Sequence, residues 1–137
     1  MSPPDELKPI DVREYVIKEQ GRYFRGGRYD PFEAASMIAL EAMLSGATDV
    51  RICRVDEWLC IQADIDWLAG KEGEIFLRLL PFLEGGPNGV TSEYFPMVFS
   101  RSVATAVRGS VRSLKGASLG PLNEMAGDWM RVVAFEI

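Results

Sequence analysis

The sequence contains no histidine, and this single absence excludes several classes of chemistry. Without histidine there is no histidine general base, no serine or cysteine triad built on one, no histidine zinc ligand and no phosphohistidine relay. Cysteine is scarce too: Cys53 and Cys60 are too few for a disulfide scaffold and lack the CxxC spacing. We therefore expect both to be small apolar thiols.

Long hydrophobic runs and an excess of basic residues are also missing. No run approaches the ~18 apolar residues of a membrane span, and residues 1–10 carry no apolar signal segment. The 15 Lys and Arg against 20 Asp and Glu give a net charge of −5, which repels phosphate backbones. We expect a cytoplasmic protein with no nucleic-acid partner and no membrane insertion.

What is present is the composition of a folded domain. The chain has 137 residues, of which 47% are apolar and 26% charged, and this length is typical of one domain. We predict an N-terminal tail and connecting segment over residues 1–29 and a single sandwich domain over residues 30–137.

The clearest helix is predicted over residues 30–45. Asp30 and Pro31 stand at the N-cap and first helical position, and Gly46 stands where a helix commonly stops. The segment between them leaves almost no polar face, which is typical of a buried central helix. Glu41 is an exception in this apolar stretch, and the core residues expected on the helix include Met37, Leu40 and Leu44.

A β-hairpin is predicted over residues 49–55 and 58–65, with Asp56 and Glu57 as a two-residue turn. That turn places Cys53 opposite Cys60. Strand side chains alternate between faces, so one face holds the expected core residues. These are Val50, Ile52, Leu59, Ile61 and Ala63.

The opposite face of this hairpin holds Cys53, Val55, Trp58 and Cys60, and in a two-layer fold it lies in solvent. An exposed tryptophan among apolar neighbours is typical of an interaction site. We predict that these four residues bind a protein partner or a second copy of the chain. The alternative is that the N-terminal segment folds back and covers them.

The rest of the chain completes an α+β pattern. Helices are predicted over residues 74–83 and 96–108, separated by the glycine-rich loop 85–89, and strands over 110–114 and 129–137. We predict a two-layer sandwich in which helices pack on one face of a mostly antiparallel or mixed sheet.

This order of elements resembles the Bergerat ATP-binding fold of the gyrase, chaperone, histidine-kinase and MutL class, over residues 30–137. Residues 37–52 (MIALEAMLSGATDVRI) resemble its first helix, turn and strand, and residues 59–64 (LCIQAD) the strand that leads to its adenine-reading Asp. Residues 85–89 (GGPNG) resemble its glycine box. Residues 107–112 (VRGSVR) resemble the helix-to-strand turn that follows.

The resemblance implies a remnant of a nucleotide pocket at Glu41, Asp64, Gly86 and Gly89. Asp64 matches the adenine-reading Asp, whereas Glu41 stands where the family has its metal-holding Asn. Met37 stands where ATPase members have their general-base Glu. Asp66 replaces a family glycine.

A second resemblance is to the N-terminal domain of type II secretion and pilus ATPases, carried by residues 46–52 and 61–66. It covers only about residues 42–67, and the sequence has no Walker A pattern.

We predict a catalytically inert regulatory or scaffold domain that acts through protein–protein interaction, with no catalytic residue, no metal and no cofactor. The alternative is a nucleotide-binding switch or weak Mg-ATPase that uses Asp64 for adenine and Glu41 for Mg²⁺. A third possibility is an unrelated α+β domain that binds a small molecule.

Overall fold

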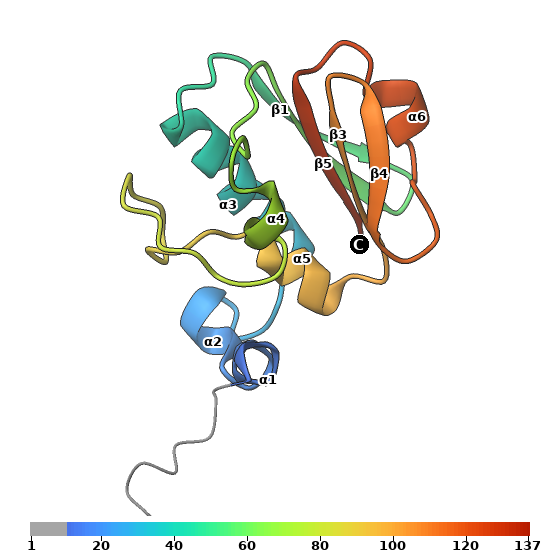
Figure 1. The fold of residues 1–137 in the computed structure, drawn as a ribbon. Helices are drawn as coiled ribbons and strands as arrows, with labels where there is room; N and C mark the ends of the chain where they lie inside the picture. The colour runs from blue at the N-terminus through green and yellow to red at the C-terminus, as the bar shows by residue number, and fades with distance from the viewer. Residues whose placement is uncertain (1–10) are drawn as a thin grey trace, which may run out of the picture.

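The computed structural model describes residues 11–137, which form six helices and one five-stranded antiparallel sheet (Figure 1). The first ten residues of the predicted N-terminal tail lie outside this described part. The sheet has the strand order β1-β2-β5-β3-β4. The elements are α1 (Val12–Lys18), α2 (Gln20–Tyr23), α3 (Pro31–Leu44), β1 (Val50–Val55), β2 (Trp58–Ala63), α4 (Glu72–Ile75), α5 (Tyr94–Phe99), β3 (Val103–Val107), β4 (Ser110–Lys115), α6 (Leu122–Met125) and β5 (Arg131–Glu136). The α+β sandwich predicted from the sequence is confirmed.

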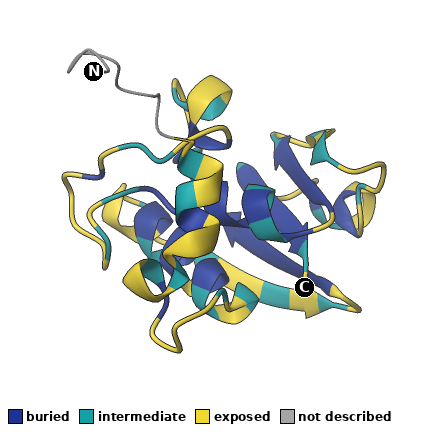
Figure 2. Ribbon diagram, turned by 90° about the horizontal axis from the view of Figure 1, so that it is seen from below, coloured by how far each residue is buried: buried dark blue, intermediate teal, exposed yellow. Residues whose placement is uncertain are grey.

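The hairpin of β1 and β2 has the predicted register. Cys53 lies opposite Cys60, and Asp56 adopts a positive φ of 51° in the two-residue turn. The C-terminal strand β5 lies in the centre of the sheet, between β2 and β3. Figure 2 shows buried residues concentrated on these central strands. Of the helices within residues 11–137, none has the length and apolar character that crossing a bilayer requires.

Helix α3 begins and ends where the sequence predicts. The Asp30 carboxylate accepts hydrogen bonds from the backbone N–H groups of Phe32 and Glu33, which fixes the start. Its inner face packs on β1 and β2, and Met37 is buried as predicted. The helix is not buried all round: Leu40 is half-buried, and the prediction that Leu44 belongs to the core is wrong, because its side chain is 41% exposed.

The long helix predicted over residues 96–108 is wrong. Helix α5 ends at Phe99, and the β-branched residues of the segment that follows form strand β3. Gly109, the residue directly after the predicted helix, lies with Arg108 in a two-residue hairpin turn in which both have positive φ. Residues 107–112 therefore join two strands, not a helix to a strand. The helix predicted over residues 74–83 is wrong over most of its length, because the single turn of α4 begins at Glu72 and ends at Ile75.

The second face of the sheet is covered by residues 119–126, which include α6 (Figure 1). Leu122 and Ala126 pack against Trp58 and Cys60, and Trp58 is only 8% exposed. The prediction that Trp58 and Cys60 lie in solvent is therefore wrong, and Cys53 and Val55 on the same face are half-buried. The N-terminal segment is not what covers it, because Val12 and Val16 pack into the core on the other face.

Gly120 is the point of closest approach between this cover and the sheet. It has a φ of +56°, and a Cβ at this position would lie 2.5 Å from the Trp58 ring. Gly109 has a comparable φ of +82° but open space around it. We expect Gly120→Ala to lower the free energy of unfolding by about 1–3 kcal/mol more than Gly109→Ala does, because of overpacking. Urea unfolding measures the free energy of unfolding of both variants. Equal losses would show that residues 119–126 are not tightly packed against Trp58.

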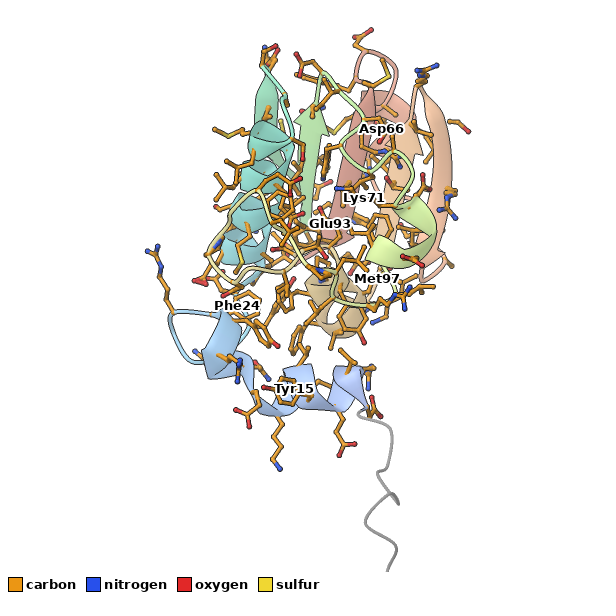
Figure 3. The ribbon with its side chains drawn as sticks, turned by 60° about the vertical axis from the view of Figure 1, so that its left-hand side comes forward. Tyr15, Phe24, Asp66, Lys71, Glu93 and Met97 are labelled. Carbon is orange, nitrogen blue, oxygen red and sulfur yellow. The ribbon has the colours of Figure 1, made fainter. Side chains whose placement is uncertain are left out.

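The segment that precedes α3 joins the same core as the rest of the molecule. Within the connecting segment predicted over residues 1–29, the structure forms helix α1. Val16 and Phe24 are fully buried, and the Phe24 ring meets the Phe95 ring of α5 edge-on at 5.0 Å between centroids. Figure 3 shows Phe24 pointing from this segment toward the body of the molecule. Residues 11–29 are thereby held against α3 and α5, where they form one wall of a cavity.

Candidate functional site

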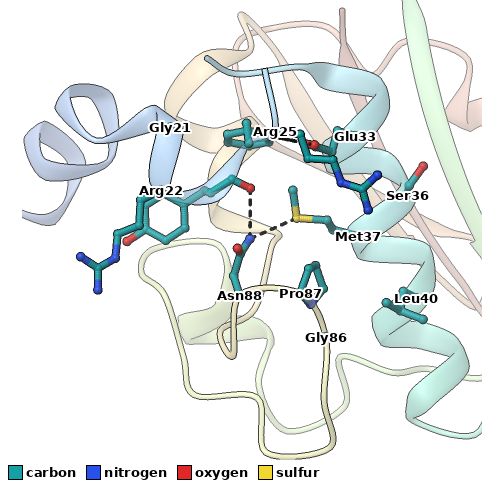
Figure 4. A pocket seen from close by; sticks show the side chains of 12 residues that line it. Gly21, Arg22, Arg25, Glu33, Ser36, Met37, Leu40, Gly86, Pro87 and Asn88 are labelled. Carbon is teal, nitrogen blue, oxygen red and sulfur yellow. Dashed lines mark hydrogen bonds between the residues drawn. The ribbon is translucent and has the colours of Figure 1, made fainter. Parts of the chain in front are cut away.

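A cavity of about 730 Å³ lies between three segments that are distant in sequence (Figure 4). One wall is formed by residues 21–25, a second by the outer side of α3, and a third by residues 86–88 of the glycine-rich loop. The α3 wall consists of Glu33, Ser36, Met37 and Leu40.

The spacing of the α3 residues explains why they form one wall. Residues at i, i+3, i+4 and i+7 lie on the same side of a helix. Of the four, Ser36 is exposed, Glu33 and Leu40 are half-buried, and Met37 is buried where this side of the helix meets the core. Met37 and Leu40 give it an apolar surface and Ser36 a polar one.

The glycine-rich loop needs its glycines to make this wall. Gly85 and Gly86 have φ values of +131° and +92°, conformations that side-chain-bearing residues rarely adopt. Asn88 ties the loop to the opposite wall, because its side-chain amide donates to the Tyr23 carbonyl at 3.4 Å. The same amide lies 3.4 Å from the Met37 sulfur, so the three walls meet at Asn88 (Figure 4).

The polar side chains that line the cavity make few hydrogen bonds with one another and bond mostly to backbone groups. Glu33 accepts hydrogen bonds from the backbone N–H of Arg25 at 3.1 and 3.2 Å, and Ser36 donates to the Phe32 carbonyl at 3.1 Å. The Arg22 guanidinium donates to the Tyr15 hydroxyl at 3.0 Å. The lining thus combines apolar side chains with charged and polar groups, the composition that is typical of a pocket for a small organic molecule.

The structure brings together some of the residues that the resemblance assigned to a nucleotide pocket. Gly86 and Met37 line the same cavity. Gly89, Glu41 and Asp64 are not part of its lining. Asp64 instead accepts hydrogen bonds from the backbone N–H and hydroxyl of Thr48, and the hydroxyl bond lowers the pKa of this carboxyl.

Glu41 is buried in a carboxyl pair with Glu93. The exposed fractions of the two residues are 3% and 0%, and Figure 3 places Glu93 in the middle of the molecule. Glu41 accepts a hydrogen bond from the Ser92 backbone N–H at 2.5 Å, and Glu93 accepts one from the Trp67 indole at 3.0 Å. Burial and the neighbouring Glu93 carboxyl raise the pKa of Glu41 far above its ordinary value of 4.5. Glu41 therefore holds a proton at neutral pH and anchors the segment that follows the glycine-rich loop.

Asp66 belongs to a different cluster from Asp64. Its carboxylate pairs with the Arg131 guanidinium through two hydrogen bonds of 2.8 and 3.0 Å, and Arg131 also donates to Glu72 and Thr105. Burial raises the pKa of Glu72, but hydrogen bonds from Arg131 and Arg112 outweigh that effect and lower it overall. Arg131 is nearly fully buried in strand β5, so the cluster fixes the loop after β2 onto the sheet.

Sequence reasoning missed Arg25, Glu93 and Arg131. Arg131 carried one usable signal, a charged residue at the head of the apolar run VVAF in a predicted strand. Arg25 carried a weaker one, its place in the basic, acid-free stretch 21–29, and Glu93 carried none, because its role depends on a contact with α3, a separate element. Within residues 11–137, no three His, Cys, Asp or Glu side chains are grouped so that they could hold a metal ion.

Comparison with known proteins adds no family assignment: no family model, no curated protein and no solved structure matches the chain. The resemblance to the Bergerat class therefore remains a hypothesis based on short motifs. What the geometry offers for a function is the cavity itself.

Proposed function

We propose that this protein is a catalytically inert regulatory domain whose input is a small organic ligand bound in the cavity between α3 and the glycine-rich loop. The observation that carries the proposal is the cavity of about 730 Å³, lined by both apolar and polar side chains. Ligand pockets typically enclose about 300–1,000 Å³ and have this mixed lining.

The lining supports binding more than catalysis. Its hydroxyl nucleophile, Ser36, donates its hydrogen bond to a backbone carbonyl of its own helix, so no base activates it. Its carboxylate, Glu33, is engaged by a backbone N–H. Met37 stands where a general-base Glu is found in the ATPases that the sequence resembles, and a thioether cannot abstract a proton.

Nucleotide binding is a second candidate, favoured by the presence of Met37 and Gly86 in one cavity. Against it, the adenine-reading position Asp64 and the metal position Glu41 both lie outside the lining. Calorimetric titration with ATP, with and without Mg²⁺, separates the two candidates. Our proposal expects no saturable binding in the low micromolar range; such binding would support the nucleotide candidate instead.

The proposal itself is tested by amide chemical-shift mapping. We expect a set of small aromatic acids, amides and alcohols to shift the amide signals of Ser36, Met37, Gly86 and Asn88 in a saturable way. These residues come from two of the walls, so a ligand between the walls moves all four. Saturable shifts confined to another surface, or none with any member of the set, would contradict the proposal.

A further inference from the structure

The segment that forms the first wall of the cavity is basic, although the chain as a whole is acidic. Residues 21–29 contain Arg22, Arg25 and Arg28 and no Asp or Glu, whereas the chain carries a net charge of −5. A local cluster of one sign in a chain of the opposite sign concentrates ligands of complementary charge. The three arginines are not equivalent, and their contacts distinguish them.

Only one of these arginines is placed to meet a ligand in the cavity. Arg22 lines it, but its guanidinium is engaged by the Tyr15 hydroxyl. Arg28 lies outside it and lines a separate, smaller cavity. Arg25 lines the cavity, and its guanidinium has no hydrogen-bond or ion-pair partner among residues 11–137.

The backbone of Arg25 is fixed while its side chain is free. Its N–H donates to both Glu33 oxygens, which anchors the residue to the first turn of α3. Figure 4 shows the Arg25 side chain extending from this anchor toward Ser36. Glu33 is the single acid of the lining, and together with Arg22 and Arg25 it leaves the lining with a net positive charge.

We propose that the cavity takes an amphipathic organic acid, whose carboxylate pairs with the Arg25 guanidinium and whose apolar body packs against Met37 and Leu40. This inference rests on the proposed function of the same cavity. An arginine fork matches a carboxylate with two parallel hydrogen bonds, and such charge-assisted bonds are among the strong ones. One free guanidinium suits a ligand with one anionic group better than it suits a polyphosphate.

The test compares two probes of nearly the same shape, 2-naphthoate and 2-naphthamide, which differ in charge. Their dissociation constants are measured by amide chemical-shift titration of the full chain. We expect wild type to bind 2-naphthoate at least about tenfold more tightly than 2-naphthamide, the ratio that one charge-assisted pair supplies. Arg25→Gln should reduce this ratio to about 1, because it removes the charge that pairs with the carboxylate. The variant keeps the backbone N–H that anchors the loop, so the cavity wall should stay in place.

Arg28→Gln is the matched control, since it removes the same charge from the same segment outside the cavity. It should keep the wild-type preference for 2-naphthoate. Equal loss of preference in Arg25→Gln and Arg28→Gln would show a diffuse charge effect and overturn the assignment to Arg25. Unchanged preference in Arg25→Gln would overturn it as well.

A blocking variant separates failure of this inference from failure of the proposed function. Ser36 is exposed and lines the cavity, so the larger side chain of Ser36→Phe narrows the space without entering the core. If wild type binds both probes equally and Ser36→Phe abolishes both, the cavity binds ligands but not organic acids. If neither probe binds wild type, or Ser36→Phe leaves binding unchanged, both proposals are overturned. Circular dichroism confirms that each variant is folded.

Discussion

Replacing Asp66 with Ala is expected to lower the free energy of unfolding by about 3 kcal/mol or more, the range measured when one partner of a buried ion pair is removed. The Arg131 side chain is only 2% exposed, and Asp66 supplies two of its hydrogen bonds. Without Asp66 the guanidinium stays buried with Glu72 and Thr105 as its remaining partners. The Leu68 backbone N–H also loses its acceptor.

Two further variants test whether the loss comes from the buried Arg131 charge, which keeps only Glu72 as an acidic partner. Asp49→Ala breaks an ion pair with Arg51 whose side chains are 49% and 63% exposed, so it should cost less than about 1 kcal/mol. The double variant Asp66→Ala/Arg131→Met should be more stable than Asp66→Ala alone, because it removes the buried charge. Urea unfolding measures all of them. A double variant less stable than Asp66→Ala would contradict this explanation.

Glu41→Gln is expected to stabilise the protein increasingly as the pH rises. In the folded state, burial and the Glu93 carboxyl raise the pKa of Glu41, whereas in the unfolded state it keeps its ordinary value of 4.5. Above that value the unfolded chain loses a proton that the folded protein retains. Wild-type stability should therefore fall as the pH rises from about 5, by up to about 1.4 kcal/mol per pH unit. Glutamine needs no proton, and its amide can donate to Glu93 while its oxygen accepts from Ser92.

The measurement is the free energy of unfolding in urea from pH 5 to pH 9. The Gln variant should be close to wild type at pH 5 and more stable by about 2–4 kcal/mol at pH 9, within the limit that the slope sets. Glu84→Gln removes an exposed carboxyl and serves as the control for net charge. If Glu41→Gln and Glu84→Gln change the pH dependence equally, Glu41 does not hold a proton in the folded state.

The elements predicted correctly are those whose signals are local. Asp30, Pro31 and Gly46 mark the two ends of α3 within the helix itself, and the Asp56–Glu57 turn fixes the register of the β1–β2 hairpin. The failure at residues 96–108 also has a local cause. A glycine after an arginine is equally suited to a helix stop and to a tight hairpin turn, and only the pairing of β3 with β4 and β5 decides between them.

The candidate site could not be predicted from local sequence patterns, because its contacts join segments that are distant in the sequence. Trp58 was predicted to be exposed because the residues that cover it, 119–126, lie between two predicted strands and have no pattern that reveals which face they pack on. Glu41 was noticed as a polar exception in an apolar helix, but its partner Ser92 follows the glycine-rich loop, 51 residues further along the chain, and Glu93 comes next. The cavity arises in the same way, since α3 forms only one of its three walls.

The proposed function requires that the cavity between α3 and the glycine-rich loop binds a small organic ligand. This is tested by amide chemical-shift titration of 2-naphthoate into wild type and into Ser36→Phe. We expect saturable shifts at residues 36–37 and 86–88 in wild type and their loss in Ser36→Phe. Shifts that persist unchanged in the blocked variant, or that map to a surface away from these walls, would contradict it.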